Sequence, residues 1–511
     1  MAQKQVLIIG EHPVGKDMAR QFILMEYNVT CLEHGTSDFD INLFDELCLL
    51  TNRTEEAAIA EDNRVVDLLG ELATKYDVAR HGGKKLVCHL LLQNHATLQL
   101  LQLSDFKEDV KERMEVYPFT IEEVWSRQIV LDWEPVTVQS EKTVHLVIMG
   151  MSQMTESLSI QAALVAHYPN YVHEHSRRTR ITIVDCDVKE MYDAFILKYK
   201  HLFDNSYYRY VNPAENKAVT FFHEPQYAKS REDFVDVEWE FVDASAYHPV
   251  VREKIELWAA APSKQLLTLV FAYDDESRNL NEALHLPDVV YHRNIPVYVK
   301  QSHAAILEQI KTEGKLKHLY PFGMLDRGYD VQQPFVQMAK SINYIYNLCY
   351  HDNIKNWTGK MRYAVELAPK ECEQQWQELS MVKRMSNIYN AMTISTKMRS
   401  VGLEKADWDK FYDISQQDIE LLAQVEHNRW SVEELILGWR PCTDEEQSKV
   451  EADIRQKDVL KKKLKAHYDL RAYNDLRTDV TGKSATIYDL CLCSCLPLIA
   501  KSFIDKKGRK E

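Results

Sequence analysis

The chain has 511 residues, of which 45% are hydrophobic and 27% are charged. This length exceeds what one hydrophobic core usually organises, so the sequence predicts several folded domains. The formal net charge of −15 opposes broad attraction to nucleic acid or anionic lipid, although a local basic patch could still act at short range.

The amino terminus and the cysteines predict the compartment. MAQKQVLIIG enters a strand-like run without the basic and then apolar layout of a signal peptide, and the ten cysteines include no CxxC pair. The apolar run at residues 490–500 contains a proline and is shorter than the about 20 residues that a bilayer requires. We therefore expect a cytoplasmic protein without membrane insertion, in which Cys491, Cys493 and Cys495 pack inside a terminal segment.

Residues 5–33 have the pattern of a βαβ unit: a short aliphatic strand, a turn at Gly10, a helix-period stretch and a second strand. In a dinucleotide-binding turn, the first glycine permits the bend, the second admits the pyrophosphate and the third lets helix and strand approach. Gly10 and Gly15 match the first and third positions. His12 occupies the second position and opposes ordinary NAD binding, whereas Glu33 stands where an acidic residue would take ribose hydroxyls.

A second unit repeats this order with a strand at 143–149, a glycine turn, a helix and the strand ITIVDCD. Ser152 and Thr155 replace its second and third glycines, so the close approach of a pyrophosphate is again opposed. NAD or a related nucleotide is the candidate cofactor, with Gly10, His12, Gly15 and Glu33 as its contacts in the first unit, and Gly150, Ser152, Gln153 and Asp185 in the second.

Both units end with Tyr-Pro-Phe, around Pro118 and Pro321, and the second is lengthened mainly between Tyr192 and Glu238. The sequence thus predicts an α/β protein with two tandem doubly wound domains, residues 1–138 and 139–345. The motifs LVIMG, ITIVDCD, LTLVFAYDDE, IPVYVKQ and LYPFG resemble TrkA-N nucleotide-binding domains, which regulate potassium transport in many bacteria. The resemblance implies Rossmann-like folds and self-association into a homo-oligomer.

The last third of the chain, residues 346–511, lacks aliphatic strand runs and predicts a mostly helical domain. Residues 374–403 have the apolar spacing of one long helix that ends at Gly402. Ser415 and Asp418 then form a capping pattern that predicts the start of a second helix.

On this second helix Glu426, Arg429, Trp430 and Glu433 share a face, because they recur at three- and four-residue steps. Arg429 could form two parallel hydrogen bonds to a phosphate or carboxylate, and Trp430 or Trp439 could stack on a planar base. Alternatively, the tryptophans belong to the core and Arg429 pairs with one of the two glutamates. Spacing alone leaves both interpretations open.

HNRWSVEELILGW, followed by KAHYDLRAYNDL, resembles the RyR domain, the small helical repeat first described in ryanodine receptors and also present in bacterial proteins. RMSNIYNAMTI resembles the preceding helix in bacterial members fused to nucleotide-binding domains. The chain departs from the motif at Tyr468, where proline is usual, and by a Glu/Lys-rich insertion before His467. The resemblance implies a ligand pocket formed by Arg384, Ser386, Asn387, His427, Arg429, Trp430, Trp439, Lys465, His467 and Tyr473.

These observations predict a cytosolic sensor whose RyR-like domain binds a small nucleotide-derived ligand; the resemblance implies a role in bacterial stress or antiviral signalling. The sequence has no GxSxG, HExxH or Walker motif and no Cys/His set with metal-ligand spacing, so no motif demands catalysis. Two alternatives stay open: an NAD-dependent enzyme that uses a Rossmann-like unit, and a regulatory subunit of an ion-transport complex with a membrane-protein partner. A nucleic-acid partner is not expected.

Overall fold

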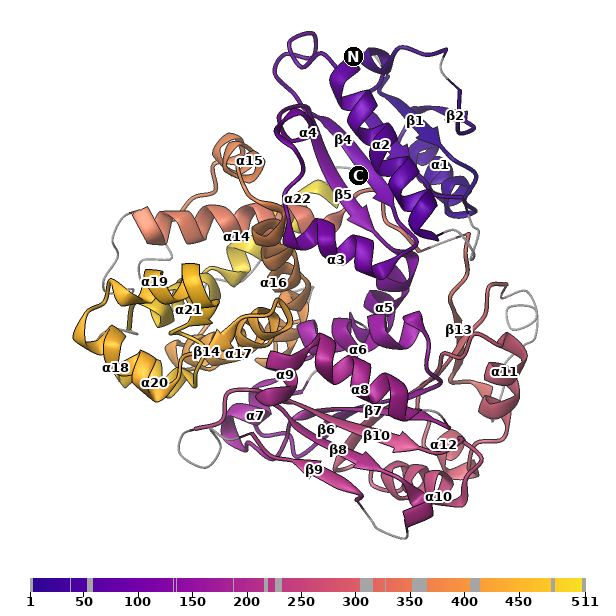
Figure 1. The fold of residues 1–511 in the computed structure, drawn as a ribbon, viewed down its shortest axis with the longest axis vertical. Helices are drawn as coiled ribbons and strands as arrows, with labels where there is room; N and C mark the ends of the chain where they lie inside the picture. The colour runs from indigo at the N-terminus through magenta and orange to yellow at the C-terminus, as the bar shows by residue number, and fades with distance from the viewer. Residues whose placement is uncertain are drawn as a thin grey trace.

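The computed structural model describes residues 3–36, 38–52, 58–131, 133–134, 136–186, 188–215, 219–225, 232–303, 316–326, 328–351, 365–404, 414–478 and 483–507. The chain is α/β: a five-stranded and an eight-stranded sheet lie at opposite ends of the molecule, and the C-terminal helices pack beside the junction between them (Figure 1). In the described part of the chain, no helix combines the length and apolar character needed to cross a bilayer.

The first sheet has the strand order β2-β1-β3-β4-β5, and all its strands are parallel. Its inner strands are aliphatic and buried because helices cover both faces of a parallel sheet. The elements are β1 (Gln5–Ile9), α1 (Val14–Leu24), β2 (Asn28–Leu32), η1 (Ile41–Leu43), β3 (Glu46–Leu49), α2 (Ala58–Lys75), β4 (Leu86–Leu91), α3 (His95–Leu103), α4 (Glu108–Arg113), β5 (Met114–Phe119) and α5 (Ile121–Leu131).

The second sheet has the order β13-β12-β11-β6-β7-β10-β8-β9 and is parallel except for the β8–β9 pair. The residues that lengthen this unit contribute β8 and β9, which extend the sheet beyond β10. The elements are β6 (Thr143–Met149), α6 (Gln153–Val165), α7 (Pro169–His173), β7 (Thr179–Asp185), α8 (Val188–Lys198), α9 (Lys200–Asp204), β8 (Tyr207–Val211), η3 (Pro213–Glu215), β9 (Phe221–His223), β10 (Val237–Asp243), α10 (Pro249–Ala259), β11 (Gln265–Phe271), α11 (Glu276–Leu284), α12 (Asp288–His292), β12 (Val297–Lys300) and β13 (Leu319–Phe322).

The C-terminal part is helical apart from one pair of two-residue strands. The Glu/Lys-rich insertion forms α18 and α19, and α14 crosses residue 346, where the sequence predicts the third domain to begin. The elements are α14 (Pro334–His351), α15 (Pro369–Gln377), α16 (Met381–Ser400), α17 (Gln416–Ile436), β14 (Arg440–Pro441), α18 (Asp444–Ala452), α19 (Gln456–Leu464), β15 (Ala466–His467), α20 (Tyr473–Thr478), α21 (Lys483–Ser494) and α22 (Leu496–Lys507).

The prediction of one helix over residues 374–403 is wrong, because the chain breaks between α15 and α16. Ser380 has an extended backbone at the amino end of α16, so the apolar Leu379 belongs to the connection and not to a helix face. The predicted stop is confirmed, since Gly402 follows α16 with φ +83°. The cap of α17 is also confirmed: the Ser415 hydroxyl accepts a hydrogen bond from the Asp418 backbone N–H at 3.0 Å.

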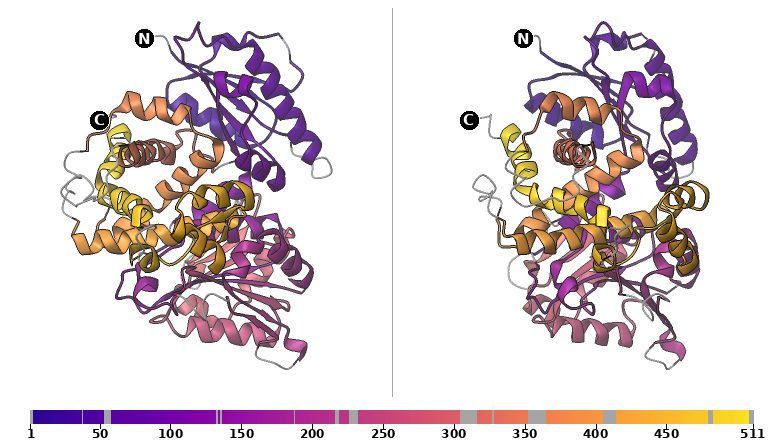
Figure 2. Two further views of the ribbon diagram at one scale, coloured as in Figure 1. Left: turned by 60° about the vertical axis from the view of Figure 1, so that its left-hand side comes forward. Right: turned by 90° about the vertical axis from the view of Figure 1, so that its left-hand side faces the viewer.

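Helices α16 and α17 connect the C-terminal part to both sheets (Figure 2). Helix α16 packs against α3 and α5 of the first unit and α6 of the second, while α17 packs against α6, α7 and α9. One buried apolar cluster runs from β1 through α5 and α6 into these two helices. A shift of α16 or α17 would therefore displace the side chains packed between the two sheets.

Candidate ligand-binding site

A cavity of about 630 Å³ lies among α14, α16, α17, α19 and α21. This volume falls in the range of pockets that hold small molecules, about 300 to 1,000 Å³. Six of the ten predicted ligand-binding residues line it: Ser386, Asn387, His427, Arg429, Trp430 and His467.

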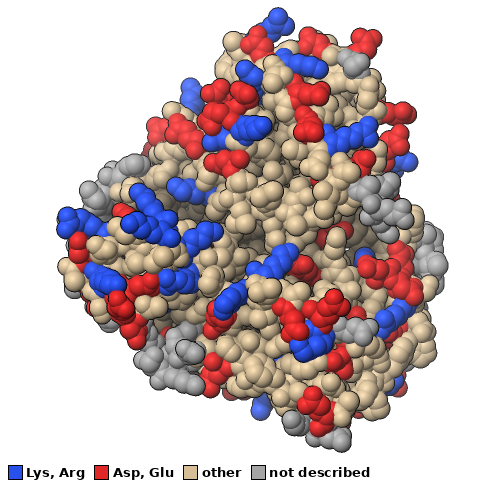
Figure 3. All heavy atoms as spheres, viewed as in Figure 1, with Lys and Arg blue, Asp and Glu red and all other residues tan. Residues whose placement is uncertain are grey.

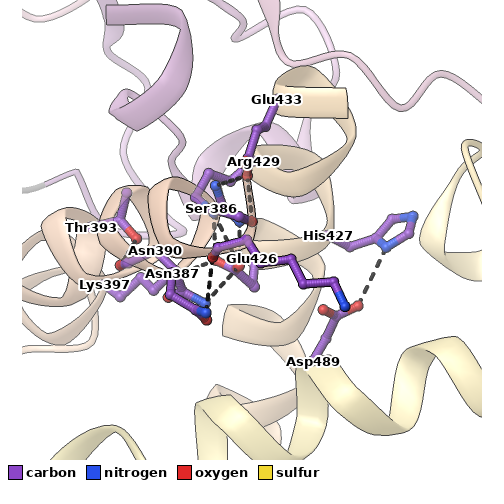
Figure 4. A network of polar contacts seen from close by, with 11 residues as sticks. Ser386, Asn387, Asn390, Thr393, Lys397, Glu426, His427, Arg429, Glu433 and Asp489 are labelled. Atoms are coloured by element: carbon purple, nitrogen blue, oxygen red, sulfur yellow. Dashed lines mark hydrogen bonds and ion pairs between the residues drawn. The ribbon is translucent and has the colours of Figure 1, made fainter. Parts of the chain in front are cut away.

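Arg429 lies at the floor of this cavity and is only 2% exposed. Figure 4 shows the network of polar contacts to which it belongs. Its Nε donates to both carboxylate oxygens of Glu426 at 3.0 Å, and its Nη2 lies 2.9 Å from Glu426 Oε1. Its Nη1 donates to Glu433 Oε2 at 2.7 Å. The ion pairs that the sequence left as an alternative are therefore present, and they occupy the guanidinium of a residue that also lines the cavity.

Helix α16 completes this network from the opposite side. The Lys397 ammonium pairs with Glu426, and the Asn390 amide donates to Glu426 Oε1 at 2.8 Å. The Ser386 hydroxyl donates to Glu433 Oε2 at 3.0 Å. Buried charges are tolerated when they are paired and hydrogen-bonded, which explains how α17 keeps three ionisable residues inside the fold.

The pKa values follow from burial and charge. Burial opposes ionisation of Glu426, but the positive charges of Arg429 and Lys397 outweigh it and lower the pKa of Glu426 to about 2. Burial opposes the charged form of Arg429 as well, yet its two glutamates raise its pKa further. Burial raises the pKa of Glu433, although the charge of Arg429 opposes this effect. The Glu426–Arg429 pair is therefore ionised at neutral pH.

His427, the next residue of α17, faces α21. Its Nδ1 lies 3.3 Å from Asp489 Oδ2, and its Nε2 is 2.9 Å from the Arg471 carbonyl oxygen. Burial alone would lower the pKa of His427, but the hydrogen bond and charge of Asp489 reverse this effect and raise it. Because the Arg471 carbonyl oxygen can only accept a hydrogen bond, His427 Nε2 carries a proton. A second proton, shared by the His427 and Asp489 side chains, lies between Nδ1 and the carboxyl.

Asp489→Asn is expected to lower the pKa of His427, because asparagine retains a hydrogen-bonding oxygen but removes the negative charge that favours the imidazolium. The measurement is an NMR titration of protein labelled in its histidine rings, with His427→Gln used to assign the resonance. A His427 pKa that is unchanged in Asp489→Asn would contradict the pairing.

The wall above this floor combines aromatic and ionisable groups. The Trp430 and His467 rings meet edge to face with centroids 4.9 Å apart. Burial lowers the pKa of His467 to about 3, so its ring is neutral at physiological pH. Burial, together with the charge of Glu433, raises the pKa of the neighbouring Glu434 to about 8. Lys461 of α19 lies across the cavity, and burial lowers its pKa.

Three tyrosines that sequence reasoning missed also line the cavity. Tyr346 and Tyr350, from α14, are 39% and 57% exposed, and Tyr488 comes from α21. The Tyr346 and Tyr488 rings stack with centroids 4.8 Å apart. The four-residue spacing of Tyr346 and Tyr350 indicates that they share a helix face. No sequence pattern indicates that α14 packs against α21, so the contact with Tyr488 could not be predicted. Glu434, Lys457, Lys461 and Asp489 were missed in the same way.

Four predicted ligand-binding residues do not line the cavity. Arg384 donates to the carbonyls of Trp376 and Gln377 at 3.2 and 3.3 Å, beside two much smaller cavities. Lys465 is exposed and ends α19 in the left-handed conformation, with φ +48°. The other two contact residues of the wall: Trp439 meets the His467 ring edge to face with centroids 5.9 Å apart, and Tyr473 meets His427 in the same way at 5.8 Å.

The lysines of α19 differ in their surroundings. Lys457 pairs with Asp469 at 2.6 Å and, with Lys461, lines the cavity. Lys462 and Lys463 are exposed. Figure 3 shows acidic and basic side chains interspersed over the face that it draws, with no continuous surface of one sign.

The first glycine turn is closed by the protein itself. Gly10 donates its N–H to the Leu32 carbonyl at 3.0 Å, and the His12 Nδ1 accepts from Val14 N at 3.2 Å. His12 is buried, so its side chain fills the position that a pyrophosphate would need free. Gly15 lies where an added Cβ would be 2.7 Å from the Leu50 side chain, which fits its predicted role in close helix packing. Glu33 is exposed.

The second turn is also held by its own chain. Both oxygens of Asp185 accept backbone hydrogen bonds, from Met151 N at 2.8 Å and Cys186 N at 2.7 Å. The Ser152 hydroxyl caps α6 and donates to the Ala272 carbonyl at 2.7 Å, while Gln153 is exposed. Each oxygen of Asp185 thus already accepts one backbone hydrogen bond, and Ser152 is turned to its own chain, so this turn offers a dinucleotide fewer unused groups than a glycine-rich turn would.

No family model, curated protein or solved structure matches the chain. Within the described residues, no group of three or more His, Cys, Asp or Glu side chains is arranged to hold a metal ion.

Proposed function

We propose that the C-terminal helices form a RyR-like domain that binds a small nucleotide-derived ligand, and that the two sheets are Rossmann-like units which carry the response. The observation that carries the proposal is the cavity of about 630 Å³, which combines aromatic rings with buried polar groups. Aromatic side chains stack on planar bases, and hydrogen-bonding groups fix the orientation of a ligand.

The strand order of the second sheet supports the Rossmann-like assignment. Read from β10 to β13, the order is β10-β7-β6-β11-β12-β13, which corresponds to 3-2-1-4-5-6 in the doubly wound sheets that bind dinucleotides. The first sheet has the order 2-1-3-4-5, the other common doubly wound arrangement. Fold alone does not assign function, so the sensing role is attached to the cavity.

The position of the cavity supports a sensing role over a catalytic one. Its walls include α16, which packs against helices of both units, and α17, which packs against helices of the second unit. A ligand that changes the position of either helix would alter the junction of the sheets, provided that it binds one arrangement better than the other. Antiviral or stress signalling by such a bacterial protein is the biological setting that we propose.

Mass spectrometry of small molecules released from the purified, denatured protein tests the proposal first, followed by calorimetric titration with ADP-ribose, cyclic nucleotides and NAD. Trp430→Ala is expected to weaken binding about tenfold or more, because one aromatic–base stack contributes about 1 to 3 kcal/mol. Trp439→Ala is the matched control, since Trp439 does not line the cavity. Equal losses in both variants, or loss in neither, would contradict the placement of the ligand.

A further inference from the structure

The buried cations of the Glu426 network are already paired. Arg429 is held by Glu426 and Glu433, and Lys397 by Glu426. At the side, Lys457 is paired with Asp469. A phosphate could bind Arg429 only by displacing a carboxylate, which would then be buried without its partner beside a new negative charge. That exchange is strongly unfavourable in a desolvated site.

The groups that remain available form a different pattern. Asn343 of α14 is buried, and its Nδ2 has no hydrogen-bond partner among the described residues. Glu434 lines the wall beside Trp430 and forms no ion pair with any cation in the described ranges. Lys461 likewise has no ion pair with a described residue, and it is more exposed than the floor residues. Asn343 therefore offers an unused donor in the interior, while two cations without an ion pair to a described residue, Lys461 and Lys383, lie nearer to solvent.

We propose that the ligand enters with its uncharged nucleoside end inward, its ribose hydroxyls bonded to the Glu434 carboxyl and its phosphate directed outward to Lys461. This proposal rests on the proposed function, since it assigns the orientation and recognition groups of the same ligand. Lys461 and not Arg429 is then the phosphate contact, because the Arg429 guanidinium is held by two glutamates. Trp430 and the tyrosines Tyr346 and Tyr488 offer the aromatic surfaces for the base.

The inward position suits a nucleoside because the floor has little net charge. Two cations face two carboxylates, and the His427–Asp489 pair adds an imidazolium beside a carboxylate or the neutral forms of both. A base and a ribose can exchange hydrogen bonds with amide and carboxyl groups without bringing a formal charge into the interior. A phosphate keeps more of its hydration beside Lys461.

Calorimetric titration with the four ribonucleosides, their 5′-monophosphates and ADP-ribose tests this orientation. For the base that binds, we expect the nucleoside and its monophosphate to differ by no more than about tenfold in Kd. Lys461→Met should weaken the monophosphate by about tenfold and leave the nucleoside unchanged. Lys462→Met is the matched control, because Lys462 is exposed on the same helix and does not line the cavity.

Glu434→Leu should weaken the ribonucleoside about tenfold, because leucine offers the ribose hydroxyls no hydrogen bond, but it should leave the 2′,3′-dideoxynucleoside unchanged, since that ligand lacks the hydroxyls. A monophosphate that binds more than a hundredfold tighter than its nucleoside, or equal effects of Glu434→Leu on both sugars, would overturn the orientation while the sensing function stands. Failure of every nucleoside and nucleotide to bind would overturn the proposed function and this inference together. Thermal melts of each variant establish that it is folded.

Discussion

Arg429→Ala is expected to destabilise the C-terminal helices by about 3 to 5 kcal/mol, the usual cost of breaking a buried ion pair from one side. The guanidinium satisfies carboxylate oxygens of both Glu426 and Glu433, and all three side chains are almost completely buried. Alanine would leave Glu433 with only the hydrogen bond from Ser386. Lys397 and Asn390 would still contact Glu426, so the loss falls mainly on the Glu433 side.

Unfolding is followed by circular dichroism and tryptophan fluorescence during thermal and urea denaturation. Arg440→Ala is the control, because its pair with Glu446 is partly exposed and such pairs contribute about 1 kcal/mol or less. Combining Arg429→Met with Glu433→Gln should recover much of the stability, since no uncompensated carboxylate remains at that end. An unchanged melt with a large loss of ligand affinity would instead make Arg429 a direct ligand contact.

Gly10→Ala is expected to destabilise the first sheet by about 3 kcal/mol or more, because it combines backbone strain with a clash against main-chain atoms. Gly10 has φ +120°, and an added Cβ would lie 2.2 Å from the Leu50 carbonyl oxygen. A clashing side chain could rotate away, but the contact here is with a main-chain oxygen. The backbone at the end of β3 would therefore have to move to relieve it.

Gly35→Ala provides the matched control. Gly35 also has a positive φ, +92°, but nothing lies within 4 Å of its added Cβ. It should therefore show the cost of the left-handed backbone alone, about 1 to 2 kcal/mol. Equal losses of stability in the two variants would mean that β3 adjusts freely and that the close approach of Gly10 to Leu50 is unimportant.

The local patterns were predictable because they depend on neighbours in the chain. Aliphatic runs ending at Gly10 and Gly150 predicted parallel strands followed by helices, and both glycines have the positive φ that such turns require. The cap at Ser415 was predicted for the same reason, since its hydroxyl and the Asp418 N–H are only three residues apart. The break at Leu379 was missed because the apolar period continues through it.

The candidate site was only partly predictable. His427, Arg429 and Trp430 stand together on one helix, so their shared position could be inferred from spacing. Other parts of the site come from far along the chain: Lys397, which pairs with Glu426, lies 29 residues before it, Asp489 lies on α21, and the tyrosines lie on α14 and α21. Arg384 matched the motif but turns away from the cavity, because its guanidinium binds the end of α15.

The sequence by itself determined the α/β class, the two parallel-sheet units and the helical character of the last third, because strand and helix periods are local properties of the chain. Only the tertiary structure decided whether Arg429 is free to meet a ligand. Glu426 and Glu433 were visible as possible partners at three and four residues, but a salt bridge on an exposed helix face exchanges readily with solvent and ligands. Packing against α16 removes water from these groups, and the loss of hydration is what fixes the pairing.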